Sequence, residues 1–245
     1  MRKLLYIITL ALVPMVSIGQ ITVNNAEDFS IGTVLRFQKC DSKEVSEGNS
    51  GVNQTWDFTT LKTIADTTIE WMVLPNETEN SSSFPNANLV EKYSDGRFVY
   101  ANKTQNENYL VGFIDAASKM TVNYTKPMLF AKRPMTFGTV VTDSFATKYT
   151  MNAMDFEGKG VVTIEADGYG KLILPNGTYN NVLRIKITQT QNDVLKQYST
   201  KTKTTTISYV WFDGVHTSCL LKINMTKSGY YNKKSVEYLL SEKKE

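Results

Sequence analysis

Metal-binding side chains are scarce in this chain of 245 residues, which has one histidine, His216, and two cysteines, Cys40 and Cys219. Protein zinc sites use two or three histidines or closely spaced cysteines, and neither set is available here. The sequence also lacks the Asp-x-Asp-x-Asp-Gly pattern of a calcium-binding loop. We therefore expect no metal and no cofactor.

Long hydrophobic runs are absent beyond the first 19 residues. At the start of the chain, two basic side chains precede an apolar run over residues 4–18, and the small residues Ser17 and Gly19 precede a suitable cleavage point. This run is shorter than the ~20 residues that a membrane-spanning helix needs. The sequence predicts a signal peptide at 1–19 and an exported chain at 20–245, with no transmembrane segment after cleavage.

An excess of charge of one sign is also lacking. The formal net charge is +3, and loss of the two basic residues of the signal peptide leaves 25 basic against 24 acidic side chains. Proteins that bind nucleic acid carry a basic patch or stripe, whereas the basic residues here are spread evenly along the chain. Nucleic acid is therefore not an expected partner.

Helical periodicity is almost absent, and alternation of apolar and polar residues dominates instead. Such alternation is typical of strands with one buried face and one face in water. The clearest apolar series are Ile69/Trp71/Val73, Met120/Val122/Tyr124, Leu183/Ile185/Ile187 and Ile207/Tyr209/Trp211. Further strands are predicted at 33–38, 97–101, 107–115, 138–149, 160–166, 169–174, 193–199 and 230–240.

Turn-forming dipeptides separate these strands. They are Asp95-Gly96, Asp167-Gly168, Asn176-Gly177 and Asp213-Gly214. A dozen or more short strands without a helix predict an all-β fold, either an antiparallel β-sandwich or a partly closed β-barrel. The pattern does not decide between these two architectures. Residues 20–245 are expected to form a single domain.

The two cysteines are candidates for a disulfide, because paired thiols are commonly oxidised in exported proteins. Cys219 begins an alternating apolar series with Leu221, Ile223 and Met225, so we expect Cys219 to point inward. Cys40 ends its predicted strand beside a polar segment, where the alternation gives no clear burial. The spacing leaves a bonded pair and two free thiols as open alternatives.

Two long polar segments, 39–54 and 75–88, interrupt the strands. Loops of this length are uncommon unless they are functional or mobile. They are interpreted either as plain surface loops or as the rim of a binding site. In the second case, Trp56 beside the first segment and Phe84 within the second are the aromatic side chains that would contact a ligand such as a glycan.

Catalytic motifs are incomplete in the glycine-containing stretch 165–190. A phosphate-binding loop needs a glycine where Glu165 stands, and a strand rather than a helix follows. Glu165 and Asp167 match the first half of the Glu-x-Asp-x-x-Glu motif of laminarinase-type glycosidases, but Gly170 replaces the second glutamate. A retaining glycosidase needs both carboxyls, so this motif alone predicts no activity.

A hydrolytic triad is equally incomplete. His216 and Ser218 lie close to Asp213 in sequence, but no Gly-x-Ser-x-Gly turn frames the serine. We assign no catalytic residue from the sequence. Hydrolase activity is kept only as an alternative, based on the pair Glu165 and Asp167 or the pair His216 and Ser218.

Several phrases of the chain recur in the same order in a known group of proteins. They are Gly51–Phe58, Met135–Thr139 with Thr142–Phe145, Ala166–Gly170 with Leu174–Arg184, and Tyr209–Phe212 followed by Leu220-Leu221. In these phrases the chain resembles an uncharacterised secreted all-β module of Bacteroidota, often found upstream of a C-terminal sorting domain for type IX secretion. We recognise no such sorting domain in the sequence up to Glu245. The resemblance implies a Gram-negative envelope and therefore a periplasmic or extracellular location.

The sequence thus predicts an exported β protein with a binding or structural role rather than an enzyme. A carbohydrate-binding module is the first alternative and a glycosidase-like hydrolase is the second. The expected partners are a glycan or another envelope protein.

Overall fold

The computed structural model describes residues 20–244, and the predicted signal peptide at 1–19 lies outside these residues. The described chain is all-β, as predicted, apart from two 3-10 turns, η1 (Pro75–Glu77) and η2 (Ser81–Ser83). None of its helical segments is long and apolar enough to cross a membrane.

The strands follow one another along the described chain, and the longest connections are residues 41–50 and 74–88. The first eight are β1 (Thr22–Val23), β2 (Thr33–Cys40), β3 (Gly51–Asp57), β4 (Thr63–Val73), β5 (Leu89–Tyr93), β6 (Arg97–Lys103), β7 (Glu107–Asp115) and β8 (Met120–Lys132). The others are β9 (Met135–Thr136), β10 (Val140–Met151), β11 (Met154–Leu174), β12 (Gly177–Leu195), β13 (Thr200–Phe212), β14 (Leu221–Ser228) and β15 (Tyr231–Lys244).

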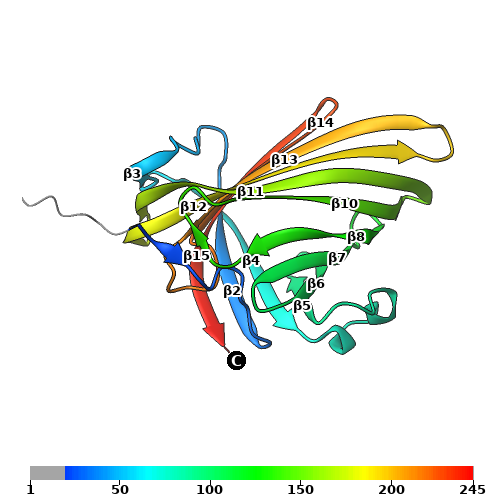
Figure 1. Cartoon of the computed structure of the whole chain (residues 1–245), viewed down its shortest axis with the longest axis horizontal. Helices are drawn as coiled ribbons and strands as arrows, with labels where there is room; N and C mark the ends of the chain where they lie inside the picture. Colours follow the sequence, from blue (N-terminus) through cyan, green and yellow to red (C-terminus); the bar gives the residue numbers. More distant parts are fainter. Residues whose placement is uncertain (1–19, 245) are drawn as a thin grey trace, which may run out of the picture.

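Twelve of these strands close into an antiparallel barrel (Figure 1). Their order is β10-β8-β7-β6-β5-β4-β2-β15-β14-β13-β12-β11, and β10 pairs back onto β11 from Val140 opposite Glu165 to Met151 opposite Met154. The C-terminal part of β11 extends beyond β10, and there the additional strand β3 pairs with it in parallel. Of the two predicted architectures, the structure is therefore the barrel, and its closure is complete.

The turn predicted at Asp167-Gly168 is wrong, because both residues lie inside β11 at a bulge opposite Arg184. The glycines of this stretch serve the approach of β3. A Cβ atom on Gly168 would lie 3.2 Å from the Gly51 carbonyl oxygen, and one on Gly170 would lie 2.0 Å from the Gln54 carbonyl oxygen. Glycine is needed at these two positions because a side chain would crowd the backbone of β3, and not because the chain must be flexible there.

The first polar segment is only partly a loop, since β2 runs to Cys40 and β3 begins at Gly51. Residues 41–61 lie against the outer face of the barrel wall, and we call them the outer cover. Two of its side chains, Trp56 and Phe58, contact the Trp211 ring edge-on, with centroid distances of 5.8 and 5.6 Å.

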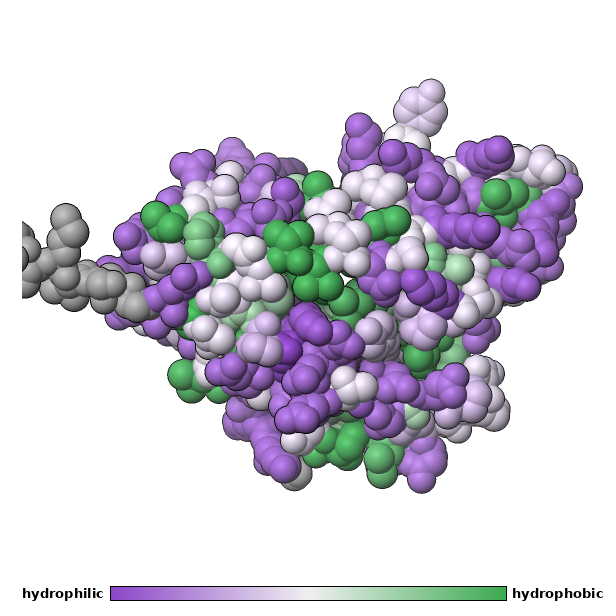
Figure 2. Space-filling model, viewed as in Figure 1, coloured by the Kyte–Doolittle hydropathy of each residue, from purple (hydrophilic) through white to green (hydrophobic). Residues whose placement is uncertain are grey.

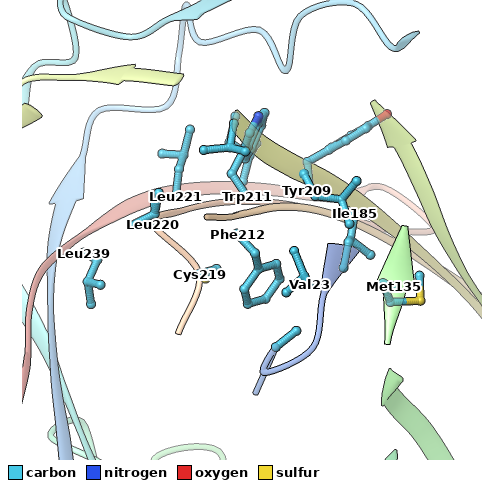
Figure 3. Packing of buried hydrophobic residues seen from close by; sticks show 14 of the residues in the cluster. Val23, Met135, Ile185, Tyr209, Trp211, Phe212, Cys219, Leu220, Leu221 and Leu239 are labelled. Carbon is cyan, nitrogen blue, oxygen red and sulfur yellow. The ribbon is translucent and has the colours of Figure 1, made fainter. Parts of the chain in front are cut away.

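The barrel wall is consequently buried on both of its faces beneath the outer cover. Figure 3 shows Tyr209, Trp211 and Leu221 on one side of the strands, with Phe212 and Cys219 on the other. All five side chains are buried.

The face of the molecule seen in Figure 2 is mainly hydrophilic, with a small group of hydrophobic residues near its middle. Scattered exposed apolar residues are common on protein surfaces and do not by themselves indicate a binding site.

The candidate disulfide is contradicted by the position of the two cysteines. Cys40 pairs with Val236, which is in the outward-facing row of β15, whereas Cys219 lines the barrel interior. The wall separates the two side chains, and a disulfide requires Cβ atoms that point toward one another. Both cysteines are buried free thiols, and burial raises the pKa of Cys40 to about 11.

We expect both thiols to be protected in the folded protein and free after unfolding. Treatment with iodoacetamide in guanidinium, without reductant, should add two carbamidomethyl groups, whereas brief treatment of the native protein should add none. Intact-mass spectrometry gives the count. An unfolded protein that takes up no label would mean that the two cysteines are bonded after all.

The close approach of β3 can be tested at Gly170. Gly170→Ala places a methyl group against backbone, so we expect it to reduce the free energy of unfolding by about 1–3 kcal/mol. Gly177→Ala is the control, because its Cβ would meet nothing nearer than a side-chain atom at 3.6 Å, and a change within about 0.5 kcal/mol is expected. Urea denaturation gives both values, and equal losses would contradict this role of Gly170.

Candidate functional site in the barrel interior

The barrel interior contains a cavity of about 200 Å³. One part of its wall is polar and comes from β4, β5 and β14, while the facing part is apolar and comes mainly from β11, β12 and β13. The principal polar residues are Glu27, Glu70, Glu91, Tyr93, Lys222 and Asn224, and the principal apolar ones are Phe37, Ile164, Ile185, Ile187, Val210 and Phe212.

The change from apolar to polar wall occurs along one row of paired residues. Ile185 lies opposite Val210, Val210 opposite Lys222, and Lys222 opposite Glu237, so all four side chains point to the same face of the sheet. Near the cavity, the inward residues of β12 (Leu183, Ile185 and Ile187) are apolar, as the alternation predicted, and farther along the same row they are polar. On β14 the inward residues are the polar ones.

Cys219 lines the interior, as predicted, but the alternating apolar residues Leu221, Ile223 and Met225 do not share its face. These residues pair with Trp211, Tyr209 and Ile207 in outward-facing rows. Because the outer cover buries this part of the outer face, its alternation carries the same apolar pattern that an inward face would carry.

Lys222 is the central cation of the polar wall. Its Nζ donates a hydrogen bond of 2.6 Å to Glu70 Oε1 and lies 3.4 Å from Glu237 Oε2. The ammonium group also lies 3.7 Å from the centroid of the Phe37 ring. Burial alone would lower the pKa of Lys222, but Glu70 and Glu237 outweigh burial and raise this pKa. Lys222 is thus shared between two carboxylates.

Glu91 has no such cation. Its Oε2 accepts a hydrogen bond of 2.9 Å from Tyr93 Oη, while Oε1 is buried and meets no donor from the described residues. Glu91 is only 6% exposed. Burial, followed by the charge of Glu70, raises the pKa of Glu91 to about 7, against the lowering effect of Tyr93. The carboxyl group therefore changes its charge near neutral pH.

The N-terminal segment places a further carboxyl, that of Glu27, in the cavity wall. Arg133 and Asn108 hold the backbone of this segment in place. Arg133 Nη1 donates to the Ala26 carbonyl at 2.8 Å, and Asn108 Nδ2 donates to the Glu27 carbonyl at 2.7 Å. Burial, followed by the charges of Glu91 and Glu70, raises the pKa of Glu27 well above its usual value, against the lowering effects of the Lys222 and Arg133 charges.

The predicted ligand-contacting aromatics lie elsewhere, in two separate clusters. Trp56 is 3% exposed, its Nε1 donates to the Asn49 carbonyl at 3.1 Å, and it forms part of the wall of a surface groove of about 700 Å³ along the outer cover. Phe84 is also 3% exposed, with its ring centroid 4.2 Å from that of Tyr100. Neither ring has a free face for stacking on a sugar.

The glycosidase-like pair is not arranged for catalysis. Asp167 forms a two-pronged ion pair with Arg184, with distances of 2.8 and 2.9 Å, and both side chains are buried. Glu165 lies opposite Lys186 in the sheet. The Asp167 carboxylate is occupied by the Arg184 guanidinium, which also lies over the rings of Trp56, Tyr209 and Trp211.

The triad-like residues do not meet either. His216 Nδ1 lies 2.9 Å from Asp213 Oδ2, but Ser218 Oγ donates to the Cys219 carbonyl at 3.4 Å. Ser218 is buried and lines the interior cavity. Within residues 20–244, no side-chain hydrogen bond joins the histidine to the serine.

Sequence reasoning did not identify Glu27, Glu70, Glu91 or Lys222. Glu70 stands between Ile69 and Trp71, which is the pattern of a solvent-facing residue on an amphipathic strand. The alternation indicates that two faces differ, but not which of them points into a barrel. Only the strand pairing brings these charges together.

Comparison with protein-family models finds no match, and none is found among curated proteins or solved structures. The described residues also contain no group of three or more histidine, cysteine or carboxylate side chains that could hold a metal ion.

The raised pKa of Glu91 makes stability depend on pH. Since the folded state holds this proton more tightly than the unfolded state, the free energy of unfolding falls as pH rises from the ordinary carboxyl value of 4.5 to about 7. Glu91→Gln lacks this titrating group and should not show the loss. We therefore expect the difference in unfolding free energy, variant minus wild type, to increase by about 1–3 kcal/mol from pH 5 to pH 8.

Denaturant titrations at the two pH values provide the measurement. The exposed Glu79→Gln is the control and should follow the wild-type pH dependence. If Glu91→Gln also follows it, Glu91 is not a buried carboxyl with a raised pKa.

Proposed function

We propose that this protein binds a small ligand in the cavity of its barrel interior. The observation that supports this proposal is the buried Oε1 atom of Glu91, which has no donor. The large majority of buried side-chain polar atoms in proteins are hydrogen-bonded, so an exception beside a cavity needs an explanation. A bound molecule that donates a hydrogen bond supplies one.

Among the described residues, Glu91 alone combines a buried side-chain atom without a hydrogen-bond partner with a position in the wall of the interior cavity. In the described residues, two further buried side-chain atoms lack a partner, Asn25 Oδ1 and Trp211 Nε1. Trp211 points to the outer cover, and Asn25 donates through its Nδ2 to the turn at residues 215–216. Neither residue lines the interior cavity.

The size and lining of the cavity suit a small molecule. An engineered apolar cavity of about 150 Å³ holds benzene, so about 200 Å³ accommodates a molecule somewhat larger than one ring. Ligand sites commonly combine an apolar wall that buries the body with a few polar groups that orient it. Both walls are present here.

A location outside the cytoplasm is part of the proposal, based on the predicted signal peptide at 1–19. A carbohydrate-binding role through Trp56 and Phe84 is less well supported, because both rings are packed against the protein. The interior cavity is also too small and too apolar on one side for an oligosaccharide. We therefore favour binding of a small molecule over both the glycan and the hydrolase alternatives.

The proposal can be tested with benzyl alcohol, which has one ring and one hydroxyl donor. In protein labelled at isoleucine δ1 methyl groups, we expect saturable NMR shifts for Ile164, Ile185 and Ile187, which line the cavity. The methyl groups of Ile207 and Ile223, in outward-facing rows, should not shift.

Blocking variants make the test specific. Ala131→Phe fills the cavity and should abolish the shifts, whereas Ala117→Phe, at an exposed position, should leave them unchanged. Ser208→Leu, also in the cavity wall, serves if Ala131→Phe does not fold. Shifts confined to the outward-facing methyl groups, or shifts that survive both blocking variants, would rule out the interior as the binding site.

A further inference from the structure

The charges around the cavity do not balance. Five elements bring ionisable groups toward Glu91, namely Glu27 from the N-terminal segment, Glu70 from β4, Tyr93 from β5, Cys219 and Lys222 from β14 and the loop before it, and Glu237 from β15. Lys132 of β8 also lines the cavity. The cations of this set are already paired.

Each cation has its own partners. Lys222 is shared by Glu70 and Glu237, and Lys132 forms an ion pair with Glu107. Arg133, just beyond the cavity wall, donates to backbone carbonyls and to Asn108 Oδ1. In the described residues, no ion pair reaches the carboxyl of Glu91 or that of Glu27.

We propose that the ligand of this cavity is a primary amine with a small hydrocarbon body, whose ammonium group is bound by Glu91 Oε1 together with the Glu27 carboxyl. This inference rests on the proposed function, because it names the chemistry of the molecule bound in the same cavity. It follows from the two carboxyls without a cation, from the buried oxygen without a donor, and from the facing apolar wall.

An ammonium group fits these positions better than other groups of similar size. It supplies three hydrogen-bond donors and one positive charge, so it can serve both carboxyls at once. A neutral hydroxyl supplies a single donor and leaves the two carboxyls to repel each other. A carboxylate ligand would add a further negative charge to a site where like charges already disfavour ionisation.

The apolar wall accounts for the rest of the ligand. Ile185, Ile187 and Val210 lie opposite the polar wall, so the hydrocarbon part of an amine bound to Glu91 would be buried against them. Rings such as Phe37, which already contacts the Lys222 ammonium, are suited to lie beside a cation.

Binding should also depend on pH in a defined direction. The ammonium pairs with ionised Glu91, whose pKa is about 7 in the free protein. An aliphatic amine stays protonated from pH 5.5 to pH 8, so only the protein side changes charge in this range. Affinity should therefore increase by at least tenfold over this interval.

The inference can be tested by calorimetric titration of the full protein with three probes of the same shape, benzylamine, benzyl alcohol and benzoate. At pH 8 we expect benzylamine to bind at least tenfold more tightly than benzyl alcohol, and benzoate to bind most weakly. Glu91→Gln and Glu27→Gln should each reduce the preference for the amine to threefold or less. The exposed Glu79→Gln should retain it.

The outcomes separate the two proposals. Equal binding of amine and alcohol, or stronger binding of benzoate, would overturn the amine inference while leaving an interior binding site in place. An amine preference that persists in both Glu91→Gln and Glu27→Gln would also overturn it. If none of the three probes binds, the proposed function fails, and the inference fails with it.

Discussion

The pairing of β10 with β11 is the constraint on which the other features of the structure depend. It runs from Val140 opposite Glu165 to Met151 opposite Met154 and closes the sheet into a barrel. Closure removes the sheet edges at this point and forces every second side chain of each strand into the interior. The excess length of β11 then provides the edge onto which β3 adds, and β3 brings the outer cover with it. Both the interior cavity and the buried outer face follow from this one closure.

The outer cover changes the energetics of the wall beneath it. Arg184 is buried there with Asp167, and its guanidinium lies 5.0 Å from the Tyr209 ring and 5.2 Å from the Trp56 ring. A buried ion pair is tolerated only where hydrogen bonds satisfy both partners, and backbone carbonyls of residues 47 and 48 complete this one. The outer face thus satisfies its charges internally. The interior does not, since the carboxyl of Glu91 has no ion-pair partner among the described residues and keeps an oxygen without a donor. Trp211 Nε1 on the outer face also lacks a partner, but it carries no charge and does not line the interior cavity. The unpaired carboxyl beside a cavity is the reason for placing function inside the barrel.

The all-β fold and most strand positions could be predicted from the sequence, because alternation and turn residues are local signals. The turn at Asn176-Gly177 closes the β11–β12 hairpin as predicted, whereas Asp167-Gly168 continues a strand, because β3 packs against its backbone. The site could not be predicted. Glu70 belongs to an ordinary alternating strand, whereas Glu91 belongs to the short strand β5, which has no alternation and was not predicted. Their common position depends on a barrel closed by residues 140–165. The separation of Cys40 from Cys219 likewise depends on which face each occupies, which alternation alone does not reveal.

The most direct test of this account is a crystal structure of the protein with benzylamine at pH 8. The account predicts a closed barrel with the amine nitrogen within hydrogen-bonding distance of Glu91 Oε1 and the ring against Ile185 and Val210. An interior filled by packed side chains, or a Glu91 carboxyl exposed to bulk solvent with the amine bound elsewhere, would contradict it.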